Sequence, residues 1–122
     1  MATEPAPVTI SDAVHRAVRV LDPSGTDQNL GELLERFEDD DQPIGVAAEA
    51  AQRIAEGLGA LDPQAEDPAI QLAGAVATYL CYRRDEITEN GNALVVLAVR
   101  AEYDGTPPEP MRSWLADAGV EV

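Results

Sequence analysis

The segment from Asp67 to Tyr82 constrains the fold more than any other part of the chain. It has the sequence DPAIQLAGAVATYLCY, and after the opening Asp-Pro only Gln71 and Thr78 have clearly polar side chains. Asp followed by Pro favours a helix start, because the Asp side chain accepts from free N–H groups and Pro has no N–H to leave unpaired. Apolar residues then occupy almost every side of a helical wheel, so this helix must be surrounded. We predict a central helix over about residues 67–89.

Four further segments show the helical spacing of apolar residues at i, i+3, i+4 and i+7. The first is expected to begin with a capping box made by Thr9 and Asp12. The third is rich in alanine, and Gly57 and Gly59 are expected to mark its end. The four segments run over residues 10–21, about 27–38, about 43–58 and 110–118.

The run from Ala93 to Val99, ALVVLAV, fits either a strand or a helix. It is rich in Val, and the Asn-Gly before it is a hairpin signal. Against a strand, the segment before it offers only Ile87 as an apolar partner. Helical spacing is kept by Leu94, Leu97, Ala98 and Ala101. We therefore predict a helix here.

These elements predict an all-α fold, a single-domain orthogonal or irregular bundle of five to six helices around the central helix. Residues 1–8 contain two prolines and no periodic pattern, so they are expected to form a flexible N-terminal arm before one helical domain at 9–122. A chain of 122 residues is long enough to fold without disulfide bonds or bound metal ions. The single cysteine, Cys81, excludes an internal disulfide and is expected to be a buried thiol. We find no internal repeat.

The charge balance is strongly acidic, with 23 Asp and Glu against eight Arg, no Lys, and a formal net charge of -15. We interpret this composition as that of a high-GC, salt-loving source, where salt screens the self-repulsion. The acids are spread from Glu4 to Glu121, whereas a nucleic-acid mimic should concentrate them in a row. Eight scattered arginines make no cationic footprint, so no direct nucleic-acid binding is expected.

The chain shows no basic apolar leader and no apolar run of about 18 residues, so we expect no membrane association. The expected location is the cytoplasm.

The sequence offers little for catalysis or metal binding. A calcium loop starting at Asp22 would place Asp27 and Leu33 where Gly and Glu are needed. Zinc would need several His or Cys residues, and the chain has one of each. His15 shares a face with Arg16 and Arg19 and is expected to be a surface imidazole. Without Lys, neither a P-loop nor a Schiff base can form. We assign no catalytic, cofactor-binding or metal residue, and expect no enzyme and no cofactor.

Two nearly all-apolar helices are more than a bundle of this size needs for its own interior. We therefore predict a structural or interaction subunit of a larger protein assembly, with protein partners in a homo-oligomer or a larger complex. Trp114 fits either a core plug or an interface anchor. Arg83 and Arg84 are expected to pair with acids of a neighbouring helix or subunit. The candidate interface residues are Trp114, Leu115, Met111, Val95, Val96, Val99, Arg83 and Arg84.

Two other functions remain open. The chain could be a small acidic cytosolic regulatory protein that binds a basic protein partner, for example through Asp39 to Asp41. It could also be a small-ligand-binding bundle or an enzyme that uses buried carboxylates.

The order of three elements resembles that in a known class of viral proteins. An early amphipathic helix is followed by an apolar helix ending in Tyr79 to Arg84, and by a short last helix after prolines, from Pro107 to Ala118. This order resembles the head-completion adaptors of tailed viruses, which are small helical subunits of a ring. The resemblance implies a head-tail connector or adaptor-type subunit, located in a virion assembled in the cytoplasm. It does not extend to the segment from Ala93 to Tyr103.

Overall fold

The computed structural model describes residues 9–22, 25–38, 47–64, 66–83, 91–104 and 106–120. These residues form six helices: α1 Ile10–Leu21, α2 Gln28–Phe37, α3 Ala47–Leu61, α4 Pro68–Arg83, α5 Gly91–Tyr103 and α6 Glu109–Asp117. The predicted all-α fold is confirmed, and the ambiguous run ALVVLAV is helical, inside α5. Outside the described residues lie the predicted arm 1–8, the predicted start of the third helix at Pro43, the acidic run 39–41, and the predicted continuation of the central helix over 84–89.

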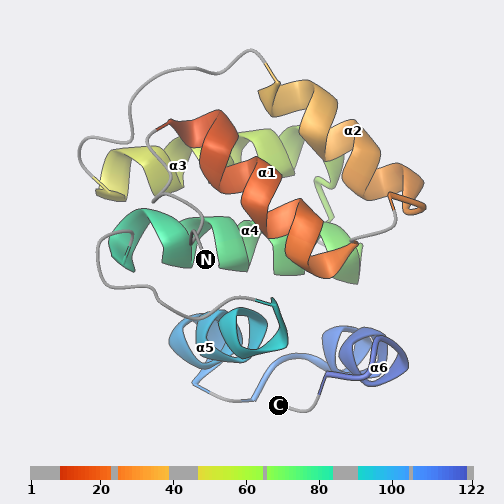
Figure 1. The fold of residues 1–122 in the computed structure, drawn as a ribbon. Coiled ribbons are helices and arrows are strands. Elements are labelled where there is room, and N and C mark those ends of the chain that lie inside the picture. The colour runs from red at the N-terminus through yellow and green to blue at the C-terminus, as the bar shows by residue number, and fades with distance from the viewer. Residues whose placement is uncertain are drawn as a thin grey trace, which may run out of the picture.

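The central position predicted for the 67–82 segment is confirmed, because α4 contacts each of the other five helices. Figure 1 shows α1, α2 and α3 on one side of α4 and α5 and α6 on the other. Leu72, Val76 and Leu80 of α4 are completely buried, and the thiol of Cys81 is buried as predicted. Each such large apolar side chain contributes about 1.5–3 kcal/mol when it is removed from water. The interior of the fold is therefore built around this one helix.

Helix α1 covers α4 with the apolar stripe expected from its sequence. Its buried residues are Ile10, Ala13, Val14, Ala17 and Val18. The capping box is also present, since Thr9 Oγ1 accepts from the Asp12 N–H at 3.1 Å and Asp12 Oδ2 accepts from the Thr9 N–H at 3.1 Å. Local sequence signals thus fix both where α1 begins and which side of it faces the core.

The prediction that Gly57 and Gly59 end the third helix is wrong, because α3 continues to Leu61. Gly57 is buried inside the helix, where the ring of Phe37 from α2 lies against its backbone. A Cβ at this position would overlap the ring, with Cε2 only 2.6 Å away. The glycine permits close contact between two helices and does not break the one that contains it.

Two connections between helices share the sequence Leu-Asp-Pro-x-x-x-Asp, at residues 21–27 between α1 and α2 and at 61–67 between α3 and α4. In the first, the Asp22 carboxylate accepts from the N–H groups of Thr26 at 3.1 Å and Asp27 at 2.9 Å. The segment that starts at Asp22, which does not match the calcium-loop pattern, is therefore a turn closed by hydrogen bonds to the Asp22 carboxylate.

The second connection repeats this arrangement. The Asp62 carboxylate accepts from the N–H groups of Glu66 at 3.1 Å and Asp67 at 2.8 Å. It also accepts from the side-chain amide of Gln71 at 3.1 Å. A chain predicted to hold no internal repeat thus carries one seven-residue motif twice, each time between two consecutive helices.

The second aspartate of each motif caps the helix that follows. Asp27 accepts from the N–H groups of Asn29 at 2.9 Å and Leu30 at 3.1 Å at the start of α2. Asp67 accepts from the Ala69 N–H at 3.0 Å at the start of α4. The side-chain amide of Asn29 also donates to Asp67. The first turn of α2 is therefore hydrogen-bonded to the connection between α3 and α4.

These hydrogen bonds lower the pKa of the first aspartate of each motif below its ordinary value of 3.8. For Asp22 the N–H of Asp27 has the largest effect, and the N–H and hydroxyl of Thr26 add to it against a burial effect that raises the pKa. For Asp62 burial is the largest single effect and raises the pKa, but the donors Asp67, Glu66 and Gln71 together outweigh it. Both carboxylates are stabilised in their charged form.

We expect the free energy of unfolding to fall as the pH drops below 3.8, in high salt that screens the general repulsion. A carboxylate with a lowered folded-state pKa stabilises the fold fully above its unfolded-state pKa, and this stabilisation is lost as the pH falls through the folded-state pKa. The Asp62→Asn variant should show a weaker dependence on pH in this range in urea unfolding followed by circular dichroism. The variant Asp117→Asn, which removes the same charge at an exposed position of α6, is the control. An equal loss of pH dependence in both variants would contradict a specific role for Asp62.

Candidate functional site

One stripe of α4 is left uncovered by the other helices. It contains Gln71, Thr78 and Tyr82, whose spacing of seven and four residues places them on one face of the helix. Gln71 and Thr78 are partly exposed. Tyr82 is 56% exposed and is the only large hydrophobic side chain among the described residues that is exposed. The two polar residues of the central segment therefore mark its open side.

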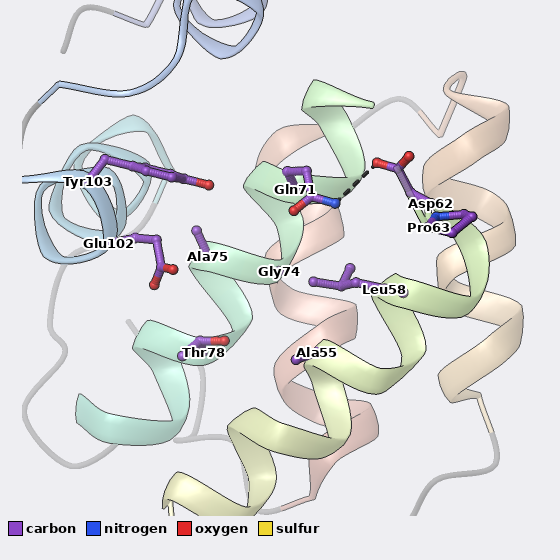
Figure 2. A pocket seen from close by; sticks show the side chains of 11 residues that line it. Ala55, Leu58, Asp62, Pro63, Gln71, Gly74, Ala75, Thr78, Glu102 and Tyr103 are labelled. Atoms are coloured by element: carbon purple, nitrogen blue, oxygen red, sulfur yellow. Dashed lines mark hydrogen bonds between the residues drawn. The ribbon is translucent and has the colours of Figure 1, made fainter. Parts of the chain in front are cut away.

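A hollow of about 310 Å³ lies over this stripe, between α3, α4 and α5 (Figure 2). Its floor is made by Gly74, Ala75 and Thr78 of α4. The α3 side includes Ala55, Leu58 and Asp62, and the α5 side is formed by Glu102 and Tyr103.

A second hollow of about 320 Å³ continues the first along α4 and α5. The two share Ala75, Thr78 and Glu102, and the second extends to Tyr82 and to Ala98 and Ala101 of α5. We call the two together the α4 groove.

The floor of the α4 groove is made of small residues. Leu58 of α3 lies against Gly74, and a Cβ on this glycine would overlap the leucine side chain. The absence of a side chain at Gly74 thus lets α3 lie close to α4.

The polar groups of the groove are held in fixed positions at its α3 end. Asp62 Oδ2 accepts both from Gln71 Nε2 and from the Asp67 N–H, so the carboxylate cannot turn freely (Figure 2). At the α5 side, burial and then the charge of Glu102 raise the pKa of Tyr103 above 10.0. This phenol keeps its proton at neutral pH. Among the described residues that line the groove the charged groups are Asp62 and Glu102, and none is an arginine.

A scan against models of protein families and searches of curated proteins and of solved structures found no match to this chain. The resemblance to head-completion adaptors stays a prediction.

Most of the interface residues predicted from sequence lie inside the chain. Met111, Leu115, Val95 and Val99 are buried, and Val96 and Trp114 are partly buried and packed against the core. The surplus apolar surface of α5 packs against α4 and α1. For Trp114 this agrees with the core interpretation. Helix α4 ends at Arg83, while the Arg83 side chain and all of Arg84 lie outside what the structure describes.

The α4 groove was not among the predicted sites, and only one signal in the sequence points to it. Gln71 and Thr78 are seven residues apart, about two helical turns, so they lie on the same side of an otherwise apolar helix. A polar pair with this spacing indicates the side that other helices of the fold leave open.

Two further features are absent from the described part of the chain. No group of three or more His, Cys, Asp or Glu side chains gathers there as a metal ion would need. None of the helices described is both long enough and apolar enough to cross a bilayer. His15 is exposed on α1, as predicted.

Proposed function

We propose that this chain is a non-enzymatic subunit of a larger protein assembly and that it binds a segment of another protein chain in the α4 groove. The observation that supports this is the open stripe of a helix that is otherwise enclosed by five others. Tyr82 at one end of the groove has an apolar ring and a polar hydroxyl, the combination that is enriched at protein interfaces.

The lining of the groove suits binding better than catalysis. Among its described residues are several alanines, two glycines and three tyrosines, without a histidine or cysteine. An amphipathic helix that places its apolar face in a hydrophobic groove is a common way of recognising a protein segment.

We also propose the cytoplasm, or a virion assembled there, as the location, and a salt-rich source. The absence of Lys and the net charge of -15 support the second point, since salt screens such a charge. A head-tail connector of a tailed virus is an assembly of the proposed kind.

The proposed binding is tested by filling the groove. In the variant Thr78→Trp, a large side chain occupies the middle of the floor, where both hollows meet. A displayed library of helix-forming peptides is selected on the wild-type protein. We expect the enriched peptides to bind Thr78→Trp at least about tenfold more weakly in fluorescence titrations, a loss of about 1.4 kcal/mol.

The matched control is Gln52→Trp, which adds the same side chain at an exposed position of α3 outside the groove. This variant should bind the selected peptides like the wild type, and circular dichroism checks that both variants are folded. Peptides that bind all three proteins equally, or a selection that enriches none, would remove the groove as a binding site.

A further inference from the structure

We propose that the segment bound in the α4 groove is a basic amphipathic helix of a different protein, whose Arg or Lys pairs with Glu102 and whose small apolar side chains lie on Thr78 and Ala101. This inference rests on the proposed function and adds the chemistry of the partner.

Glu102 provides the first reason, because it lies where the two hollows of the groove meet. It is exposed and belongs to the last turn of α5. A helix ends in carbonyl groups with a partial negative charge, so a carboxylate there is poorly placed unless a cation comes near. The only basic residue of that turn is Arg100, which is about 200° around the helix from Glu102 and does not line the groove.

The shape of the groove provides the second reason. Of its small lining residues, Ala55 on α3 and Ala101 on α5 are exposed and Thr78 on α4 is partly exposed, so the surface that a partner can reach has no bulky side chain at these positions. An approaching helix would meet apolar surface in the middle and the carboxylates of Asp62 and Glu102 on opposite sides. A partner that complements the groove therefore has a small apolar face flanked by positively charged side chains.

The overall charge provides the third reason. It favours a different protein over a second copy of this chain as the occupant of the groove. Each copy carries a net charge of -15. Two copies in contact would bring carboxylates of their acidic surfaces within a few ångströms of each other, where even high salt screens incompletely, since the Debye length is about 3 Å at 1 M. A basic partner gains attraction from the same surfaces, which raises its rate of association.

The peptide selection described above also tests the partner's chemistry, by the sequences it yields and by one charge variant. We expect the peptides that depend on the open groove to carry more Lys and Arg than Asp and Glu. The strongest of them, made synthetically, should bind Glu102→Gln about fivefold more weakly than the wild type, the size of one partly exposed ion pair. Its affinity should also fall as salt is added.

The control variant Glu56→Gln removes an equal charge at an exposed site of α3 that lies outside the groove. It should lower the affinity much less than Glu102→Gln. Groove-dependent peptides without a basic excess, or equal binding to wild type and Glu102→Gln, would overturn the basic partner and leave the proposed function standing. A selection without any groove-dependent peptide would overturn both.

A second copy as the occupant gives a different result. Light scattering would then show a concentration-dependent mass above 13.0 kDa that Thr78→Trp abolishes. That result would also overturn the basic partner.

Discussion

Replacing Phe37 by alanine should lower the free energy of unfolding by about 3–5 kcal/mol, the usual cost of removing a buried aromatic ring. The ring is only 4% exposed and lies at the end of α2, where it packs on the backbone of Gly57 in α3. Small domains are stable by about 5–15 kcal/mol in total, so this one ring would account for a large part. Urea unfolding followed by circular dichroism measures the loss.

A substitution at Gly57, on which the ring of Phe37 packs, should have opposite effects with and without that ring. In the wild type, Gly57→Ala gains about 1 kcal/mol of helix propensity but forces the ring to move, and overpacking costs about 1–3 kcal/mol. We expect net destabilisation. In the Phe37→Ala background the space is empty, so the same substitution should stabilise the fold by about 1 kcal/mol. A double-mutant cycle measures this reversal of sign.

Gly31 of α2 supplies the control, because a Cβ built there meets no atom within 4 Å. Gly31→Ala should therefore stabilise the protein by about 1 kcal/mol in both backgrounds. If Gly57→Ala stabilised the wild type as much as Gly31→Ala does, the close contact between α2 and α3 would be contradicted.

Features of the fold that depend on neighbouring residues could be predicted from the sequence. The capping box of Thr9 and Asp12 needs partners only three residues apart, so the sequence shows it directly. The central position of α4 was also predictable, since a helix that is apolar on nearly all sides has to be enclosed.

Features that depend on distant partners could not be predicted in this way. Gly57 has the sequence signal of a helix end, and its actual role appears only when Phe37, twenty residues earlier, packs on it. In the same way, Val95 and Val99 belong to the apolar surface of α5, which we predicted to contact a partner subunit. This surface is buried against α4 and α1, an outcome that periodicity along α5 cannot show.

The α4 groove illustrates the same limit. A helix with apolar residues all round has no preferred face, so its sequence pattern does not say which stripe the other helices leave open. Gln71 and Thr78 carried a weak signal, whereas the sides of the groove come from α3 and α5 and depend on the tertiary arrangement.

Substitutions at two neighbouring positions of α4 should separate folding from binding. Leu80 is completely buried, and Leu80→Ala should lower the free energy of unfolding by about 2–5 kcal/mol. Tyr82, two residues later, faces the groove and is 56% exposed. Tyr82→Ala should change the free energy of unfolding by no more than about 0.5 kcal/mol, because an exposed position loses little packing and alanine favours the helix.

Binding should show the reverse order. Tyr82→Ala removes the largest side chain that the groove offers to a partner, so the selected peptides should bind it about tenfold more weakly. Leu80→Ala, measured where it is still folded, should bind them like the wild type, because its side chain does not line the groove. Urea unfolding and fluorescence titration of the same two variants give both answers. Equal losses of stability would mean that α4 is not enclosed on one side and open on the other, and the groove would then have no floor on which a partner could bind.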